Sequence, residues 1–332
     1  MASGTPDGNT TSSLYALMSR MDAFQGSLSY RIRVFSSNVD RRISGAFDDS
    51  DVEAEETDTE RFFITRWFDG YFLDDTHLDH TNRSYLRLRG GYTFDSKAEN
   101  HWISDVKARI RLPLSQERLQ LFIGDDTREG SDLTAAGTGE ESSGAGLRFT
   151  MQQYVPKRMS SGTSIGISSL DNPYAKLYVD YTLLDGDWLV KPVQTFRYSK
   201  ESEFEEWTDF FVAKRLPDEG IVQLLLQRST RSHVDAMEYM AELSYWKVNR
   251  HRIGFQPYVA LYGRTKALGT YDNGERIDSG IYNYAAGLIW RRSVLRDYLF
   301  FQAHPSVMCH EHYAYRANYL LHLTFEIYFG NL

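Results

Sequence analysis

Polar and apolar residues alternate along most of the chain from about residue 84 onward. In the stretch WISDVKARIRLP, Val106, Ala108 and Ile110 alternate with charged residues. A helix would spread those charges around its surface, whereas a strand places them on one face and the aliphatic side chains on the other. The pattern predicts 14 strands, at 84–95, 102–113, 117–127, 145–155, 160–169, 173–184, 187–199, 204–215, 221–231, 236–248, 253–265, 281–292, 298–308 and 317–329.

The lengths of the predicted strands and of their connections favour a membrane-spanning barrel. Strands of about ten residues are typical of tilted transmembrane strands and are longer than most strands of soluble proteins. Short turns such as PLSQ and LPDEG fall on one side, and the long loops DDTREGSDLTAAGTGEESSG and KALGTYDNGERIDSG fall on the other. Outer-membrane barrels have short periplasmic turns and long external loops. The sequence therefore predicts an all-β fold, a transmembrane antiparallel β-barrel of about 14 strands with both chain ends on the periplasmic side.

A soluble all-β protein is the alternative interpretation. In a lipocalin-like barrel or a sandwich, the aliphatic face would form the core and the charged face would meet water. Alternation alone does not distinguish the inside of a barrel from its outside. The two interpretations therefore differ in whether the aliphatic or the charged face of the strands points inward.

The residues ahead of the barrel follow a helical period. Apolar residues recur at steps of three or four between residues 13 and 47, beginning with Leu14, Leu17 and Met21. This spacing predicts one long amphipathic helix. The acidic run DDSDVEAEETDTE is typical of a solvated linker, and the aromatic stretch at 61–75 is compatible with a helix or a strand. We therefore expect a disordered segment at 1–12, a helical segment with its acidic linker at 13–80, and the barrel at 81–332.

Composition excludes several classes of protein. Hydrophobic residues make up 42% of the chain and the mean hydropathy is -0.47, and no run of about 18 apolar residues could form a transmembrane helix. The net charge of -8 argues against a nucleic-acid partner. Cys309 is the only cysteine, which excludes an internal disulfide. The start MASGTPDGNTTSS lacks the cationic and apolar regions of a signal peptide, so an exported form would need a signal ahead of it.

The last predicted strand carries a resemblance to a known class. HLTFEIYFGNL resembles the C-terminal signal strand of Gram-negative outer-membrane β-barrel proteins, which commonly ends in an aromatic residue, although here Gly330, Asn331 and Leu332 follow Phe329. The resemblance covers roughly residues 84–332 and concerns architecture. A segment ahead of a barrel of this size is also similar to the long-chain fatty acid transporters, but none of their motifs is present. The resemblance implies a location in the cell outer membrane, in contact with its lipid.

In a membrane barrel the charged face of each strand lines the lumen. Early strands supply mainly basic residues and later strands supply carboxylates, so we expect this lumen-lining set: Arg87, Arg89, Lys107, Arg109, Arg111, Arg148, Glu238, Glu242 and Glu326. Opposed charges of this kind create a transverse field that favours charged or dipolar solutes. The same residues would also fit a lumen packed with salt bridges, in which Glu326 pairs with Arg87 or Arg89 across the closing strands. The sequence leaves both arrangements open.

One pair of residues has the types needed for hydrolysis. His304 and Ser306 lie two apart on one strand, as in some outer-membrane lipid-hydrolysing enzymes, and Glu326 or His322 on the next strand could be the third member. Pro305 interrupts the ladder between them, and such pairs are common by chance. We therefore expect no catalytic residues and treat lipid hydrolysis as a remote alternative.

A cluster of metal-ligand residue types follows at Cys309, His310, Glu311 and His312. It falls in a predicted external loop, where we expect a solvated segment without a metal. No phosphate-binding loop, dinucleotide fingerprint or zinc ribbon is present, and we expect no cofactor.

These features together predict a passive pore or transporter for small charged or dipolar solutes. The alternative is a membrane anchor or scaffold whose N-terminal helix binds a periplasmic protein or a second copy through residues 13–47. The helix has one apolar stripe, which is a poor match for a polar lumen. We therefore expect it to lie outside the lumen, against a membrane surface, a partner or its own barrel.

Overall fold

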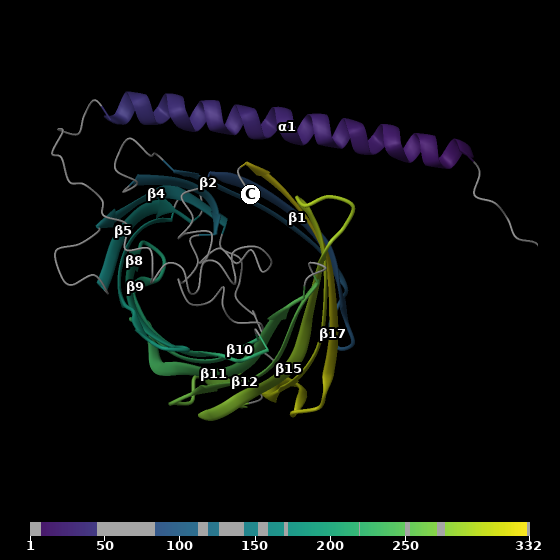
Figure 1. Cartoon of the computed structure of the whole chain (residues 1–332). Helices are drawn as coiled ribbons and strands as arrows, with labels where there is room; N and C mark the ends of the chain where they lie inside the picture. The colour runs from purple at the N-terminus through teal and green to yellow at the C-terminus, as the bar shows by residue number, and fades with distance from the viewer. Residues whose placement is uncertain are drawn as a thin grey trace, which may run out of the picture.

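Fourteen antiparallel strands close into one barrel in this computed structural model (Figure 1). The structure describes residues 8–44, 84–111, 119–125, 143–151, 159–168, 172–218, 220–249, 253–270 and 276–330. Most strands pair with their neighbours in sequence, the pairing of β6 with β8 joins the two parts of the ring, and the pairing of β1 with β17 closes it. The prediction of a closed antiparallel barrel is confirmed.

The wall of the barrel contains a strand at each of the 14 predicted positions. Their bounds are β1 Tyr85–Asp95, β2 His101–Arg111, β3 Leu119–Asp125, β4 Ser143–Met151, β5 Met159–Ile167, β6 Pro173–Tyr181, β8 Trp188–Ser199, β9 Glu203–Arg215, β10 Ile221–Arg231, β11 Val234–Val248, β12 Ile253–Arg264, β15 Gly280–Ser293, β16 Leu299–His310 and β17 Asn318–Gly330. Three short strands accompany them: β7 Leu183–Asp185, which pairs with the start of β8, and β13 Gly269–Thr270 with β14 Arg276–Ile277, which form a separate hairpin. A short 3-10 helix, Glu311–Tyr313, joins β16 to β17.

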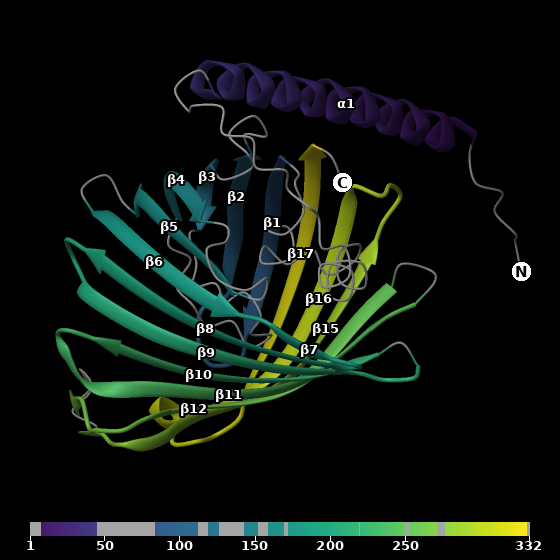
Figure 2. The ribbon, with the colours of Figure 1, turned by 60° about the vertical axis from the view of Figure 1, so that its left-hand side comes forward.

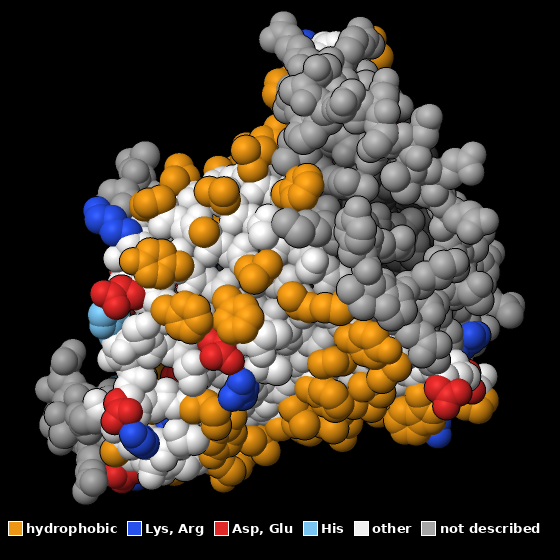
Figure 3. Space-filling view, turned by 90° about the vertical axis from the view of Figure 1, so that its left-hand side faces the viewer, with side chains coloured by type: hydrophobic (Ala, Val, Ile, Leu, Met, Phe, Trp, Pro, Cys, Tyr) orange, Lys and Arg blue, Asp and Glu red, His pale blue; other side chains and the backbone are white. Residues whose placement is uncertain are grey.

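The two faces of the wall differ in the way that a membrane requires. Large apolar side chains are exposed on the outside of the barrel, among them Ile165, Val106 and Val259, at 68%, 52% and 54%. The intervening positions face inward and are buried, and many of them are charged. Figure 3 shows apolar side chains spread over one flank of the outer surface. A soluble barrel would have the opposite arrangement, so that alternative is wrong.

The long helix α1, Gly8–Ser44, lies outside the barrel (Figures 1 and 2). It runs across the rim where β1 begins and β17 ends, next to the C-terminus. The helix begins before the predicted residue 13, so the expected disorder is wrong for residues 8–12, and residues 1–7 lie outside the described part of the chain. The acidic linker and the aromatic stretch at 61–75 also lie outside the described residues. No helix among those described is long and apolar enough to cross a membrane.

Candidate functional site: the inner wall of the barrel

Basic side chains follow one another around the inner face of the first strands. Arg87 on β1 lies directly opposite Lys107 on β2, and both are buried. A second row runs across four neighbouring strands through the register partners Arg148, Ser164, Lys176 and Arg197, on β4, β5, β6 and β8. Sequence reasoning missed Lys176 and Arg197 as lining residues, although Lys176 alternates with Leu177 in the same pattern that identified the others.

The structure places the expected lining residues as follows. Six of them are buried at inward positions of the wall: Arg87, Lys107, Arg109, Arg148, Glu242 and Glu326. Arg89 and Glu238 are half-buried and have the same inward parity on their strands. Arg111 is the last residue of β2, and its side chain lies outside the described part.

Carboxylates are interleaved with these basic residues around the wall. Arg87 donates to Asp105 at 2.9 Å, and Arg197 contacts Glu205 at 3.4 Å. Such cross-strand pairs stabilise neighbouring strands and neutralise part of the charge. The early strands therefore carry carboxylates as well as the basic residues that predominate there.

Glu326 pairs with Arg291, which the sequence analysis did not name, and the charges of the two expected residues, Arg87 and Arg89, also act on it. Its carboxylate accepts a hydrogen bond from Arg291 at 2.5 Å, and the Tyr328 hydroxyl donates to it at 3.1 Å. Arg89 lies directly opposite Glu326 on β1, but Arg291 reaches it from β15, across the intervening β16. The pair is almost completely buried, at 5% and 4% side-chain exposure.

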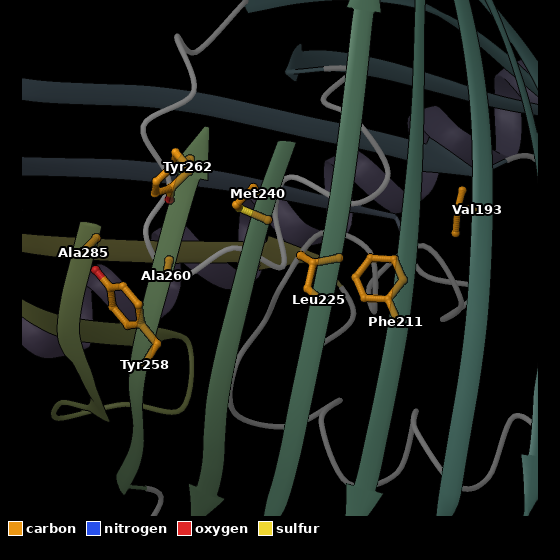
Figure 4. Close-up of a cluster of buried hydrophobic side chains, with 8 residues drawn as sticks. All are labelled: Val193, Phe211, Leu225, Met240, Tyr258, Ala260, Tyr262 and Ala285. Carbon is orange, nitrogen blue, oxygen red and sulfur yellow. The ribbon is translucent and has the colours of Figure 1, made fainter. Parts of the chain in front are cut away.

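The inner wall of the later strands carries an apolar cluster. Figure 4 shows its eight side chains on strands β8 to β15: Val193, Phe211, Leu225, Met240, Tyr258, Ala260, Tyr262 and Ala285. All of them are buried. The inner wall over β8 to β15 therefore combines this apolar cluster with buried charged side chains such as Asp209, Glu242 and Arg291. The sequence analysis did not predict this apolar cluster.

Tyr258 separates the two residues that could have formed a hydrolytic pair. His304 Nε2 lies 2.8 Å from the Tyr258 hydroxyl, which also hydrogen-bonds Ser306. Tyr258 therefore occupies the position that a serine nucleophile needs beside its general base. Glu326, proposed as a third member, is bound to Arg291 instead. This geometry gives no support to lipid hydrolysis.

The metal-ligand residue types do not converge: Cys309 and His310 end β16, and only Glu311 and His312 lie in the connection where we expected all four. Glu311 pairs with Arg264, and the His310 ring accepts a hydrogen bond from the backbone of His312 at 3.0 Å. Within the part of the chain that the structure describes, no group of three His, Cys, Asp or Glu residues could hold a metal ion.

Helix α1 is attached to the rim by one ion pair and three smaller contacts. Arg296, in the turn between β15 and β16, donates two hydrogen bonds of 2.8 Å to the Asp22 carboxylate, and the Tyr298 hydroxyl donates a third at 2.6 Å. The hydrogen bond from Arg296 and, to a smaller extent, that from Tyr298 lower the pKa of Asp22 to about 2. Ser29 accepts a hydrogen bond from the Gly330 backbone at 2.8 Å, and Phe24 packs edge-on against Phe329.

The chain has only distant structural similarity to known proteins. No protein-family model and no curated protein matches the chain. Among solved structures, OccK10 (OpdN) of Pseudomonas aeruginosa has a TM-score of 0.44 at 9% identity, covering 75% of this chain and 99% of that one. OmpT, an outer-membrane protein of Vibrio cholerae, has a TM-score of 0.42 at 9% identity, covering 74% and 96%.

The class of this protein follows from the wall of its own barrel. A closed antiparallel barrel leaves no strand edge unpaired, as a bilayer requires. Its exposed apolar exterior and buried charged interior are the reverse of a soluble barrel and are those of a transmembrane β-barrel. The protein is therefore a transmembrane antiparallel β-barrel, the architecture of outer-membrane barrels.

Proposed function

We propose that the barrel is a passive pore for small charged or dipolar solutes. The observation that carries this proposal is the set of inward basic side chains on β1 to β8, of which Arg87, Lys107 and Lys176 are buried and Arg197 is half-buried. Charges lining a narrow passage with low-dielectric walls act strongly on a passing solute, because the field is focused there. The basic rows favour solutes that carry an anionic group.

Planar-bilayer recording tests this proposal directly. The purified chain should conduct, and its reversal potential in a salt gradient should show a preference for anions. Lys107→Glu should shift that preference towards cations, because the side chain is inward and buried. Lys214→Glu is the matched control, since Lys214 is exposed beside Trp188 on the outer face of β9 and should leave selectivity unchanged. A chain that stays silent, also after deletion of residues 1–80, would refute the pore.

Helix α1 supports a second candidate function, an anchor or scaffold. It lies outside the barrel and keeps three aromatic side chains exposed, Phe24 at 63%, Tyr30 at 62% and Phe35 at 54%. Exposed aromatics on a helix at the rim are available to a periplasmic protein or to a second copy. A photo-crosslinker at Tyr30 distinguishes the outcomes in cells. Crosslinks to one defined protein would support the scaffold, whereas crosslinks only to lipid or to the same barrel would count against it.

A further inference from the structure

Two histidines lie side by side on the inner wall, on the last two strands of the barrel. His304 on β16 is the direct register partner of His322 on β17. Their ring centroids are 5.3 Å apart and the ring planes differ by 34°. Imidazole is the commonest metal ligand in proteins, and directly opposed residues of an antiparallel pair bring their side chains into reach of one another.

Each ring is held by a hydroxyl group through one of its nitrogens. The Tyr258 hydroxyl lies 2.8 Å from His304 Nε2, and the Thr93 hydroxyl lies 2.8 Å from His322 Nδ1. The remaining nitrogens, His304 Nδ1 and His322 Nε2, make no hydrogen bond to any residue in the described part of the chain. When a hydroxyl accepts from one ring N–H, the other nitrogen presents its lone pair, and a hydrogen bond at the second ring nitrogen is what orients a metal-binding histidine.

The supporting hydroxyls are themselves fixed by the wall. Tyr258 extends from β12 across Gly287 of β15 to reach β16, and a Cβ at Gly287 would lie only 2.7 Å from the tyrosine hydroxyl. Thr93 is completely buried between β2 and β17. The two imidazoles are therefore supported by groups that have little freedom to move, which is what a binding site requires of its second shell.

We propose that His304 and His322 form a two-imidazole site for a divalent transition-metal ion. Nitrogen ligands select Zn²⁺, Ni²⁺ or Cu²⁺ over Mg²⁺ and Ca²⁺, which prefer oxygen. Two protein ligands leave the remaining coordination positions to water or to a solute in the lumen. The metal ion would therefore keep coordination positions free for exchange. Binding of the ion by the two imidazoles does not depend on whether the barrel conducts.

Metal titration of the full-length protein in detergent at neutral pH tests the proposal. Calorimetry with Zn²⁺ should show one site, and bound Cu²⁺ should show two imidazole nitrogens in its electron paramagnetic resonance spectrum. His304→Ala and His322→Ala should each weaken binding by at least about tenfold and leave one nitrogen. Tyr258→Phe and Thr93→Val should weaken it by about tenfold through loss of the supporting hydroxyl.

A third histidine provides the matched control. His233 lies in the turn between β10 and β11 with its side chain 59% exposed, close to Glu203. His233→Ala should bind Zn²⁺ as the parent does. Heat-modifiable migration shows which variants are folded, and the glutamine variant at the same position, His304→Gln or His322→Gln, replaces an alanine variant that is not. Unchanged affinity in folded His304 and His322 variants, or an equal loss in the His233 variant, would overturn the proposal.

Discussion

Removing Arg291 should destabilise the barrel by leaving a buried carboxylate without its cation. Arg291 and Glu326 are both almost fully buried, and their side-chain atoms are 2.5 Å apart. Loss of one partner of a buried pair typically costs about 3–5 kcal/mol. Here the Tyr328 hydroxyl still donates to Glu326, and Arg89 lies opposite it on β1, so we expect the lower end, about 3 kcal/mol, for Arg291→Met.

A double-mutant cycle separates this cost from ordinary packing. Glu326→Leu removes the charge that Arg291→Met would leave unpaired, so the double variant should lie within about 1 kcal/mol of the parent protein. The assay is urea unfolding in detergent or lipid, followed by heat-modifiable migration. A loss below about 1 kcal/mol for Arg291→Met alone would refute the reasoning, because it would mean that the pair behaves as a solvated one.

Three further changes test other parts of the structure. Gly287→Val should destabilise by about 1–3 kcal/mol in urea unfolding, because its Cβ would meet the tyrosine hydroxyl at 2.7 Å; Gly90→Val, with nothing within 4 Å, should cost less. Acid should detach helix α1: the folded pKa of Asp22 is lowered to about 2, so the contact with Arg296 is complete above the ordinary aspartate pKa and is lost as pH falls towards 2. Limited proteolysis of the helix measures this, and Asp22→Asn should show the same release at neutral pH. Leu177→Arg, at an outward position that is 41% exposed, should cost about 2–4 kcal/mol in a bilayer if it lies near the midplane.

The sequence predicted the strands because their alternation is a local property. Each strand of this barrel has one face towards lipid and one towards the interior, so its period of two can be read without knowing its neighbours. In β2, for example, Val106 is exposed and Lys107 is buried, which is the alternation that a membrane barrel requires. The strand order followed as well, since antiparallel neighbours joined by short connections leave few other arrangements.

The features that the sequence did not predict depend on distant residues. Arg291 reaches Glu326 across an intervening strand, and Tyr258 reaches His304 only because residue 287 is a glycine. The apolar inner cluster was missed because β10 reads IVQLLLQRSTR, with apolar residues on both faces and therefore little contrast. The early start of helix α1 was missed because its first residues, GNTTSS, have no apolar period of their own.

The asymmetry of the inner wall gives the proposed pore its physical basis for selection. The basic rows over β1 to β8 act on charge, whereas the cluster around Phe211 and Leu225 offers apolar surface on the other part of the same wall. A solute with an anionic group and an apolar portion would be oriented between the two, because the basic rows attract its charge and the cluster accommodates its apolar portion. A uniformly charged ring would attract the same solute without orienting it. Selectivity should therefore depend on the position of a charge around the wall as well as on its sign, which is why a single buried lysine such as Lys107 is the informative residue to reverse.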